Sequence, residues 1–322
     1  MVGMIKFKPL TATPDEAMHN SHYFCDYIEL LALTDCDDGI RITGIYDRFL
    51  EDNKIEGIGS SDGSQNVEEW NTKINIWFSE IECRKKHYQE YYPFLLTENK
   101  LMLKENLSEY NYLYIFFLLC SSFSYIENYN RLSTVFEKLS CLVLKKYLPN
   151  IAEVYNFGAS TAKNERYNGS LQQKFSLLAQ DLKLTLSDAP NIFNHKNNGD
   201  GGVDLVAWVP FRDDLNLDRK QIFVGQSACG KNWVNKQASV DRVKNYLIDL
   251  PNNCQNVLFI PYDIRDFERN FVHCGELTAS IVFDRYRMLK LIDYQNIQTD
   301  PIIGPLYCSI IESALNYKED II

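Results

Sequence analysis

The chain has 322 residues, of which 45% are hydrophobic and 13% aromatic; this excludes a disordered chain and favours two domains over one. Its formal net charge of −10 argues against tight nonspecific binding of nucleic acid by the chain alone. The longest apolar run, residues 113–120, is far shorter than the ~20 residues of a membrane span, and the amino terminus contains no signal-peptide core, so we expect a soluble cytoplasmic protein without a membrane partner.

The first part of the sequence predicts mainly helices. A helix is expected from Pro14 to Leu33, with Thr13 as the candidate N-cap. Residues 41–50 are compatible with a short strand or a helix, and residues 55–66 have the Gly and Ser content of a linker.

A second helix is predicted over residues 67–86, because apolar side chains recur there at spacings of three and four. This spacing favours a core role for the tryptophans over stacking on nucleic-acid bases. A buried helix is expected near residues 112–122. The apolar stripe of the second helix consists of Trp70, Ile74, Trp77, Phe78 and Ile81.

The second part opens with two amphipathic helices, over residues 131–148 and 169–184. Glu137 lies beside the apolar stripe of the first, and the second is expected to pack beneath a sheet. The predicted stripes are Phe136, Leu139, Val143 and Tyr147 in the first helix, and Leu171, Phe175, Leu178 and Leu182 in the second.

Two β-branched and aromatic runs, residues 203–211 and 221–225, predict a hairpin. Asp204 stands at the start of the first strand, so it is expected to meet the polar residues that follow the second strand. Beyond the hairpin, a helix is predicted over residues 233–250, a buried strand within 256–263 and a last strand within 280–293.

These residues resemble the PD-(D/E)XK superfamily of restriction-endonuclease-like nucleases, particularly its Mrr-like branch, where a GDGG-hydrophobic-Asp strand precedes a strand ending in Gln-x-Lys. The resemblance covers roughly the C-terminal 60% of the chain and is strongest in the run GDGGVDLVAW, residues 199–208. It departs from the family where Gln226 replaces the second acid and Ala228 occupies the usual lysine position. A lysine, Lys231, follows three residues later.

The resemblance implies an α/β (α+β) protein: a mostly helical N-terminal region, residues 1–125, followed by a restriction-endonuclease-like core of a small mixed sheet flanked by helices, residues 126–322. It also implies hydrolysis of DNA with Mg²⁺ or Mn²⁺, in a prokaryotic restriction or antiphage defence system. Nine cysteines without a CxxC pair provide no support for a zinc site instead.

The resemblance also implies the roles of individual residues. Asp204 is expected to be the first metal ligand, with the amide oxygen of Gln226 and the backbone carbonyl of Ser227 as further ligands. Glu137 corresponds to a helix glutamate that completes the metal site in the family. Lys231 is expected to orient or deprotonate water, or to stabilise developing charge.

Purely structural roles are alternatives for two of these residues. Asp204 lies in an apolar strand, where an unpaired carboxylate is costly to bury, but a buried ion pair with Arg285 would also explain it. Glu137 is equally compatible with an ordinary solvated helix glutamate.

The negative charge is concentrated in the first part. Residues 1–125 contain 11 Lys and Arg against 20 Asp and Glu, a net of −9, whereas residues 126–322 contain 22 against 23, a net of −1. A partner protein of the ATPase or helicase type, or a homo-oligomer, is therefore expected to help in binding DNA. Two rival functions stay open: a degenerate nuclease fold that binds nucleic acid or protein without cutting, and a regulatory subunit whose acidic part docks on a basic partner or mimics DNA.

Overall fold

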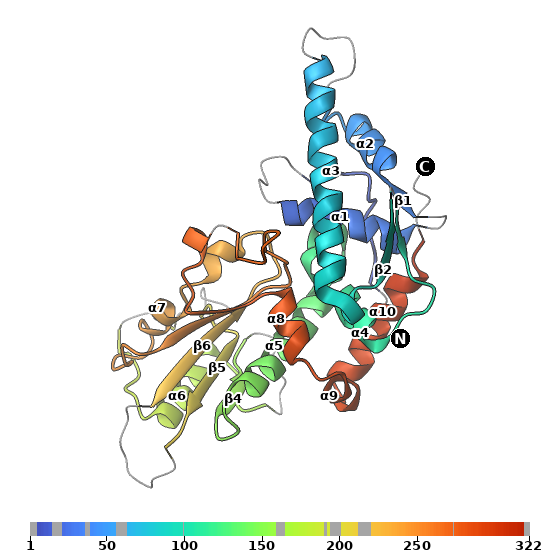
Figure 1. Cartoon of the computed structure of the whole chain (residues 1–322). Helices are drawn as coiled ribbons and strands as arrows, with labels where there is room; N and C mark the ends of the chain where they lie inside the picture. Colours follow the sequence, from blue (N-terminus) through green and yellow to red (C-terminus); the bar gives the residue numbers. More distant parts are fainter. Residues whose placement is uncertain are drawn as a thin grey trace. The chain divides into compact units, whose positions relative to one another are not determined.

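The computed structural model describes residues 5–14, 21–35, 39–55, 63–98, 100–158, 165–189, 192–193, 201–211, 220–272 and 274–318. The chain forms two compact units (Figure 1). Unit 1 consists of residues 1–132, 262–272 and 294–322, and unit 2 of residues 133–261 and 273–293.

This division differs from the predicted domains in one respect. The first boundary lies at residue 132, close to the predicted 125, but residues 262–272 and 294–322 belong to unit 1 and not to the second domain. Side-chain packing explains their assignment. Asp263 faces Arg84 of unit 1 at 3.6 Å, and the Tyr307 ring packs on Phe116 with centroids 5.5 Å apart.

Unit 1 combines helices with a small antiparallel sheet. Its strands are β1 (Ile40–Arg41), β2 (Phe94–Thr97) and β3 (Lys100–Leu103), in the order β1-β3-β2. The β2–β3 hairpin does not follow from the sequence patterns above. The main helices are α1 (Ser21–Thr34), α2 (Ile42–Glu51), α3 (Gly63–Tyr88), α4 (Glu109–Ser121), α9 (Tyr294–Thr299) and α10 (Ile303–Asn316).

The first predicted helix needs correction. Its described part begins at Ser21, and Pro14 is not helical; residues 15–20 lie outside the described residues. Thr13 is not an N-cap, because its backbone N–H and its hydroxyl both donate to the carboxylate of Asp52, the former at 2.9 Å. The side chain that was expected to begin α1 therefore bonds instead to the residue that follows α2.

The apolar stripe of α3 is in the core of unit 1, as predicted, since all five of its side chains are buried. Trp77 stacks on Phe24 of α1, with ring centroids 4.2 Å apart and an interplanar angle of 5°. Stacking of this kind belongs to core packing. The tryptophans of α3 are therefore not available for stacking on bases.

Unit 1 also contains a buried ionic cluster around Arg84. Its Nη1 lies 2.7 Å from Asp26 and 3.1 Å from Glu29, and all three side chains are at most 4% exposed. Burial disfavours the charged guanidinium, but the Glu29 and Asp26 carboxylates outweigh this effect and raise the pKa of Arg84. Two hydroxyls also donate to Glu29 at 2.9 Å, those of Tyr92 and Tyr114.

Unit 2 is built on a five-stranded mixed sheet, which confirms the predicted α/β class. The order is β4-β5-β6-β7-β8; the first three strands are antiparallel neighbours, whereas β7 runs parallel to β6 and β8 parallel to β7. The predicted hairpin is β5–β6, although its turn, residues 212–219, lies outside the described residues. The strands are β4 (Glu153–Asn156), β5 (Leu205–Val209), β6 (Gln221–Ser227), β7 (Gln255–Phe259) and β8 (Ile281–Phe283).

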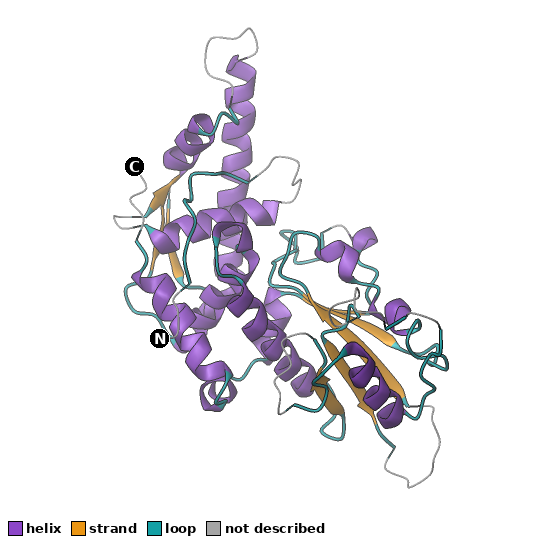
Figure 2. Ribbon diagram, turned by 180° about the vertical axis from the view of Figure 1, so that it is seen from behind, coloured by secondary structure: helices purple, strands orange, loops and turns teal. Residues whose placement is uncertain are grey.

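Helices cover both faces of this sheet. Figure 2 shows α6 (Leu171–Leu182) lying across one face, where its four predicted apolar residues join the buried core of the sheet. On the other face, Tyr147 at the end of α5 (Asn130–Tyr147) contacts Phe283, with ring centroids 5.1 Å apart. The predicted stripe of α5 is buried except for Tyr147, which is 50% exposed because it is the last helical residue.

The predicted helix over residues 233–250 is much shorter in the structure. A 3₁₀ turn, Trp233–Lys236, is followed by α7 (Ser239–Val243) only. Beyond it, Tyr246 and Ile248 use their backbone groups to bond Ser187 and Thr185, so these groups cannot serve a continuing helix. After β8 the chain forms α8 (Arg285–Leu291), which Asp284 caps through its carboxylate.

Candidate functional site

Asp204 lies directly before β5, beside the last residue of β6. Its backbone N–H donates to the Gly225 carbonyl at 3.0 Å, and its Oδ2 accepts the Ser227 backbone N–H at 2.7 Å. The side chain is 5% exposed. The ladder between the two strands thus fixes both the backbone and the carboxylate of Asp204.

The chain segment after β4 meets the same residue. Phe157 and Gly158 both donate their backbone N–H to the Asp204 carbonyl, at 2.7 and 3.0 Å. A Cβ atom on Gly158 would lie 3.1 Å from Asp204 Oδ1 and 3.2 Å from Glu137 Oε2. Both distances are measured from the same Cβ position, so the two carboxylate oxygens lie no farther apart than the sum of these two distances. The structure therefore brings together Asp204 and the helix glutamate, Glu137, that the resemblance selects.

Ser227 adds a hydroxyl to this end of the sheet. Its side chain is only 9% exposed, and its Oγ has no hydrogen-bond partner among the described residues. A buried hydroxyl in this state is costly unless something else binds it. The residue whose N–H holds Asp204 therefore also offers an oxygen ligand, in addition to the backbone carbonyl that was expected.

These groups fit a small divalent cation. Mg²⁺ keeps several waters and needs only one or two protein carboxylates, all of its ligands being oxygens. Burial raises the pKa of the Cys141 thiol, one turn after Glu137 on α5, to about 11. Within the described ranges, His, Cys, Asp and Glu form no group of three or more suited to a metal. Carboxylate and hydroxyl oxygens are donors of the kind that Mg²⁺ and Mn²⁺ bind, whereas structural zinc sites use Cys and His.

Gln226 makes a different contact from the one expected. Its side-chain oxygen accepts a hydrogen bond from Nη1 of Arg242 in α7 at 2.8 Å, and the same nitrogen donates to the Gly202 carbonyl at 3.4 Å. Gly202 has a φ of +77°, and a Cβ there would lie 2.4 Å from Arg242, so only glycine fits. Gln226 and Arg242 together hold the glycine-rich approach to Asp204; residues 199–200 of that motif lie outside the described residues.

Ala228, at the family's usual lysine position, and Lys231 differ in exposure. Ala228 is fully buried, and its N–H donates to the Phe259 carbonyl at 2.9 Å. Lys231 is exposed on the turn that follows the strand. The three atoms nearest to a Cβ on Gly158 belong to Asp204 and Glu137, and none of them belongs to Lys231.

A lysine outside the predicted site bonds the backbone turn that meets the two carboxylates. Lys174 in α6 is 5% exposed, and its Nζ donates to the Phe157 and Gly158 carbonyls at 2.8 and 2.7 Å. The sequence did contain a signal for it. Lys174 falls three residues after Leu171 and four before Leu178, so it occupies a position on the buried stripe of the helix.

The alternative partner of Asp204 does not fit the sheet order. Arg285 begins α8 after β8, which is three strand positions from β5 and hence about 14 Å away along the sheet. Arg285 is fully buried, and its Nε donates to the Pro261 carbonyl at 2.8 Å. Among the contacts described, Asp204 bonds Gly225 and Ser227, and Arg285 bonds Pro261.

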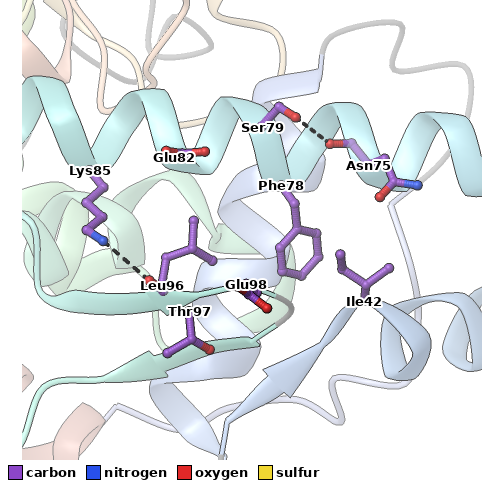
Figure 3. A pocket seen from close by; sticks show the side chains of 9 residues that line it. All are labelled: Ile42, Asn75, Phe78, Ser79, Glu82, Lys85, Leu96, Thr97 and Glu98. Atoms are coloured by element: carbon purple, nitrogen blue, oxygen red, sulfur yellow. Dashed lines mark hydrogen bonds between the residues drawn. The ribbon is translucent and has the colours of Figure 1, made fainter.

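Unit 1 contains a separate cavity of about 650 Å³ between α3 and β2 (Figure 3). Its lining includes two acids, Glu82 and Glu98, and one lysine, Lys85, which donates to the Leu96 carbonyl at 3.3 Å. The lining mixes both charges with apolar side chains and contains none of the site residues predicted from the sequence.

No family model, curated protein or solved structure matches this chain. Of the helices in the described ranges, none is both long and apolar enough to cross a bilayer. The fold and site thus define an α/β protein in which two carboxylates meet at the end of a mixed sheet.

Replacing Gly158 by alanine is expected to weaken the binding of Mn²⁺ about tenfold, which corresponds to about 1.4 kcal/mol in binding free energy. The new methyl group would lie within 3.2 Å of both carboxylate oxygens and would push them apart. Isothermal titration of the full chain with Mn²⁺ measures the effect. Gly230→Ala is the matched control, because a Cβ there meets nothing within 4 Å. Equal affinities for the two variants would contradict the convergence at Gly158.

Proposed function

We propose that unit 2 is a nuclease that hydrolyses phosphodiester bonds of DNA with Mg²⁺ or Mn²⁺. The observation that carries this proposal is the meeting of Asp204 and Glu137 at Gly158, beside the buried hydroxyl of Ser227. The order α5, β4, α6, β5, β6, α7, β7 supports it, because α6, β5, β6, α7 and β7 follow the order of helix, strands, helix and strand that the resemblance to PD-(D/E)XK nucleases implies.

The proposed reaction is attack of water on phosphorus. A bond forms between the water oxygen and phosphorus while the water releases a proton, the bond to the leaving sugar oxygen breaks, and that oxygen takes up a proton. A bound divalent ion would lower the pKa of the attacking water and neutralise charge on the phosphate. Asp204 and Glu137 would hold the ion through their carboxylates. The Ser227 N–H keeps the Asp204 carboxylate in a single orientation.

We further propose that DNA reaches this site with the help of a partner. The chain has a formal charge of −10, so it lacks the excess of lysine and arginine that tight phosphate binding needs. An ATPase or helicase-type protein or a second copy of the chain would supply the attraction. Such a pairing suits a restriction or antiphage defence system.

A catalytically degenerate fold is the second candidate, and two observations favour it. The Gln226 oxygen, which stands in place of the second acid, accepts a hydrogen bond from Arg242, and the usual lysine position is the buried Ala228. Such a protein would bind nucleic acid or a partner without cutting. Such a protein would bind DNA with an affinity that falls as salt rises, and it would form no cleavage product.

The test is incubation of the purified full chain with supercoiled plasmid, linear duplex, single-stranded DNA and single-stranded RNA, in Mg²⁺, in Mn²⁺ and in EDTA. Cleavage in either metal that EDTA abolishes is the expected result, and the substrate panel separates DNA from RNA. Metal-independent cleavage would contradict the proposal. Absence of cleavage, also with the protein that co-purifies from the native host, would favour the degenerate fold.

A further inference from the structure

We infer that Lys174 of α6 is the catalytic ammonium of this site and that it contacts the phosphate of a bound phosphodiester. The inference rests on the proposed function and assigns the cationic role to a residue outside the β6 motif. Three groups of observations carry it: the contacts of the ammonium, its burial, and the placement of the other lysines.

The contacts attach the Lys174 ammonium to the same backbone turn that meets both carboxylates. Its Nζ donates to the carbonyls of Phe157 and Gly158 at 2.8 and 2.7 Å. The N–H groups of the same two residues bind the Asp204 carbonyl, and a Cβ atom on Gly158 would touch Asp204 Oδ1 and Glu137 Oε2. One short turn after β4 therefore joins the cation to the two acids.

The burial of Lys174 calls for opposite charge nearby. An ammonium that is 5% exposed is costly to bury unless opposite charge lies nearby. The carboxylates of Asp204 and Glu137 offset this cost, and Lys174 in turn lowers the repulsion between them. An ammonium held in such a place is oriented in advance and stabilises charge that develops on a phosphate without reorganisation.

The first turn of α6 fixes the backbone position from which the Lys174 side chain extends. Ser170 and Gln173 form a capping box at the start of the helix, and the Lys174 N–H donates to the Ser170 carbonyl at 3.0 Å. The stem then follows the apolar face of α6 towards the sheet. Lys174 thus approaches from a rigid helix, whereas Lys231 is exposed on a turn.

Lys138 of α5 supplies a matched control. It is as deeply buried as Lys174, at 6% exposure, and belongs to the same unit. Its Nζ is paired with Glu165 at 2.6 Å, which gives it a structural role. Lys138→Met therefore removes a buried lysine without removing the cation beside Gly158.

The experiment compares the full chain with Lys174→Met, Lys174→Gln and Lys138→Met, in Mn²⁺ binding and in plasmid cleavage. Glutamine keeps a donor for the backbone carbonyls, so it serves if the methionine variant fails to fold. In both Lys174 variants we expect kcat to fall about 100-fold with KM changed little. We also expect Mn²⁺ to bind at least about threefold more tightly, because a positive charge beside the carboxylates has been removed. Lys138→Met is expected to change neither the kcat of cleavage nor the affinity for Mn²⁺.

The two readouts separate the possible failures. Cleavage by both Lys174 variants at the wild-type rate, or Mn²⁺ binding unchanged in both, overturns the role of Lys174 while the nuclease proposal stands. If the wild-type chain does not cut, either alone or with the protein that co-purifies from the native host, the nuclease proposal fails, and Mn²⁺ binding alone decides whether the ammonium lies beside the metal ligands. A merely structural lysine would weaken or preserve Mn²⁺ binding and would not tighten it.

Discussion

Replacing Asp204 by asparagine is expected to lower metal-dependent cleavage by at least about 10³-fold and to remove most of the binding of Mn²⁺. Asparagine has nearly the same shape, and its oxygen can still accept the Ser227 N–H that Asp204 accepts at 2.7 Å. The substitution therefore removes the charge while the local backbone is kept. The measurements are single-turnover cleavage and titration with Mn²⁺.

Glu137→Gln is expected to have a smaller effect, about 10- to 100-fold on cleavage, because Asp204 would still hold the ion. Asp249→Asn is the matched control, since this exposed acid of unit 2 bonds only Thr185 among the contacts described. Thermal melting of each variant separates loss of the site from loss of the fold. A wild-type rate for Asp204→Asn would contradict the proposed site, and a wild-type rate for Glu137→Gln would return this residue to an ordinary helix glutamate.

Replacing Arg84 by methionine is expected to lower the free energy of unfolding by about 3–5 kcal/mol, because it leaves buried carboxylates without their cation. Arg84 lies 2.7 Å from Asp26, 3.1 Å from Glu29 and 3.6 Å from Asp263, all of them at most 4% exposed. Denaturant unfolding measures the loss. Hydrogen exchange of residues 262–272 should also accelerate, because Asp263 attaches that segment to Arg84.

Lys86→Met provides the control on the same helix. Lys86 pairs with Glu82 at 2.9 Å, but these side chains are 69% and 54% exposed, so no measurable change in stability is expected. A second test adds Asp26→Asn and Glu29→Gln to Arg84→Met. Removing the stranded charges should recover part of the loss. Full stability of the single Arg84 variant would show that the cluster contributes nothing to unit 1.

Hydrophobic periodicity predicted the long helices and buried strands of this protein well. Helix α3 has its five-residue stripe buried as expected, and the apolar runs of the second part became β5, β6 and β7. Such elements are predictable because their burial pattern repeats along neighbouring residues. The predicted N-cap at Thr13 and the long helix after β6 were wrong, since residues distant in sequence, Asp52 and residues 185–187, bind the groups concerned.

The sequence by itself determined that Asp204 is an acid at the start of the first strand of an apolar hairpin and that Glu137 lies on an amphipathic helix. Only the tertiary structure decided that the two carboxylates meet, because the turn at Gly158 that joins them belongs to neither element. It also bonded Gln226 to Arg242 and brought Lys174 to the carbonyls beside Asp204. These contacts cross 16 residues or more of sequence, and no local pattern encodes which distant backbone group a long side chain will reach.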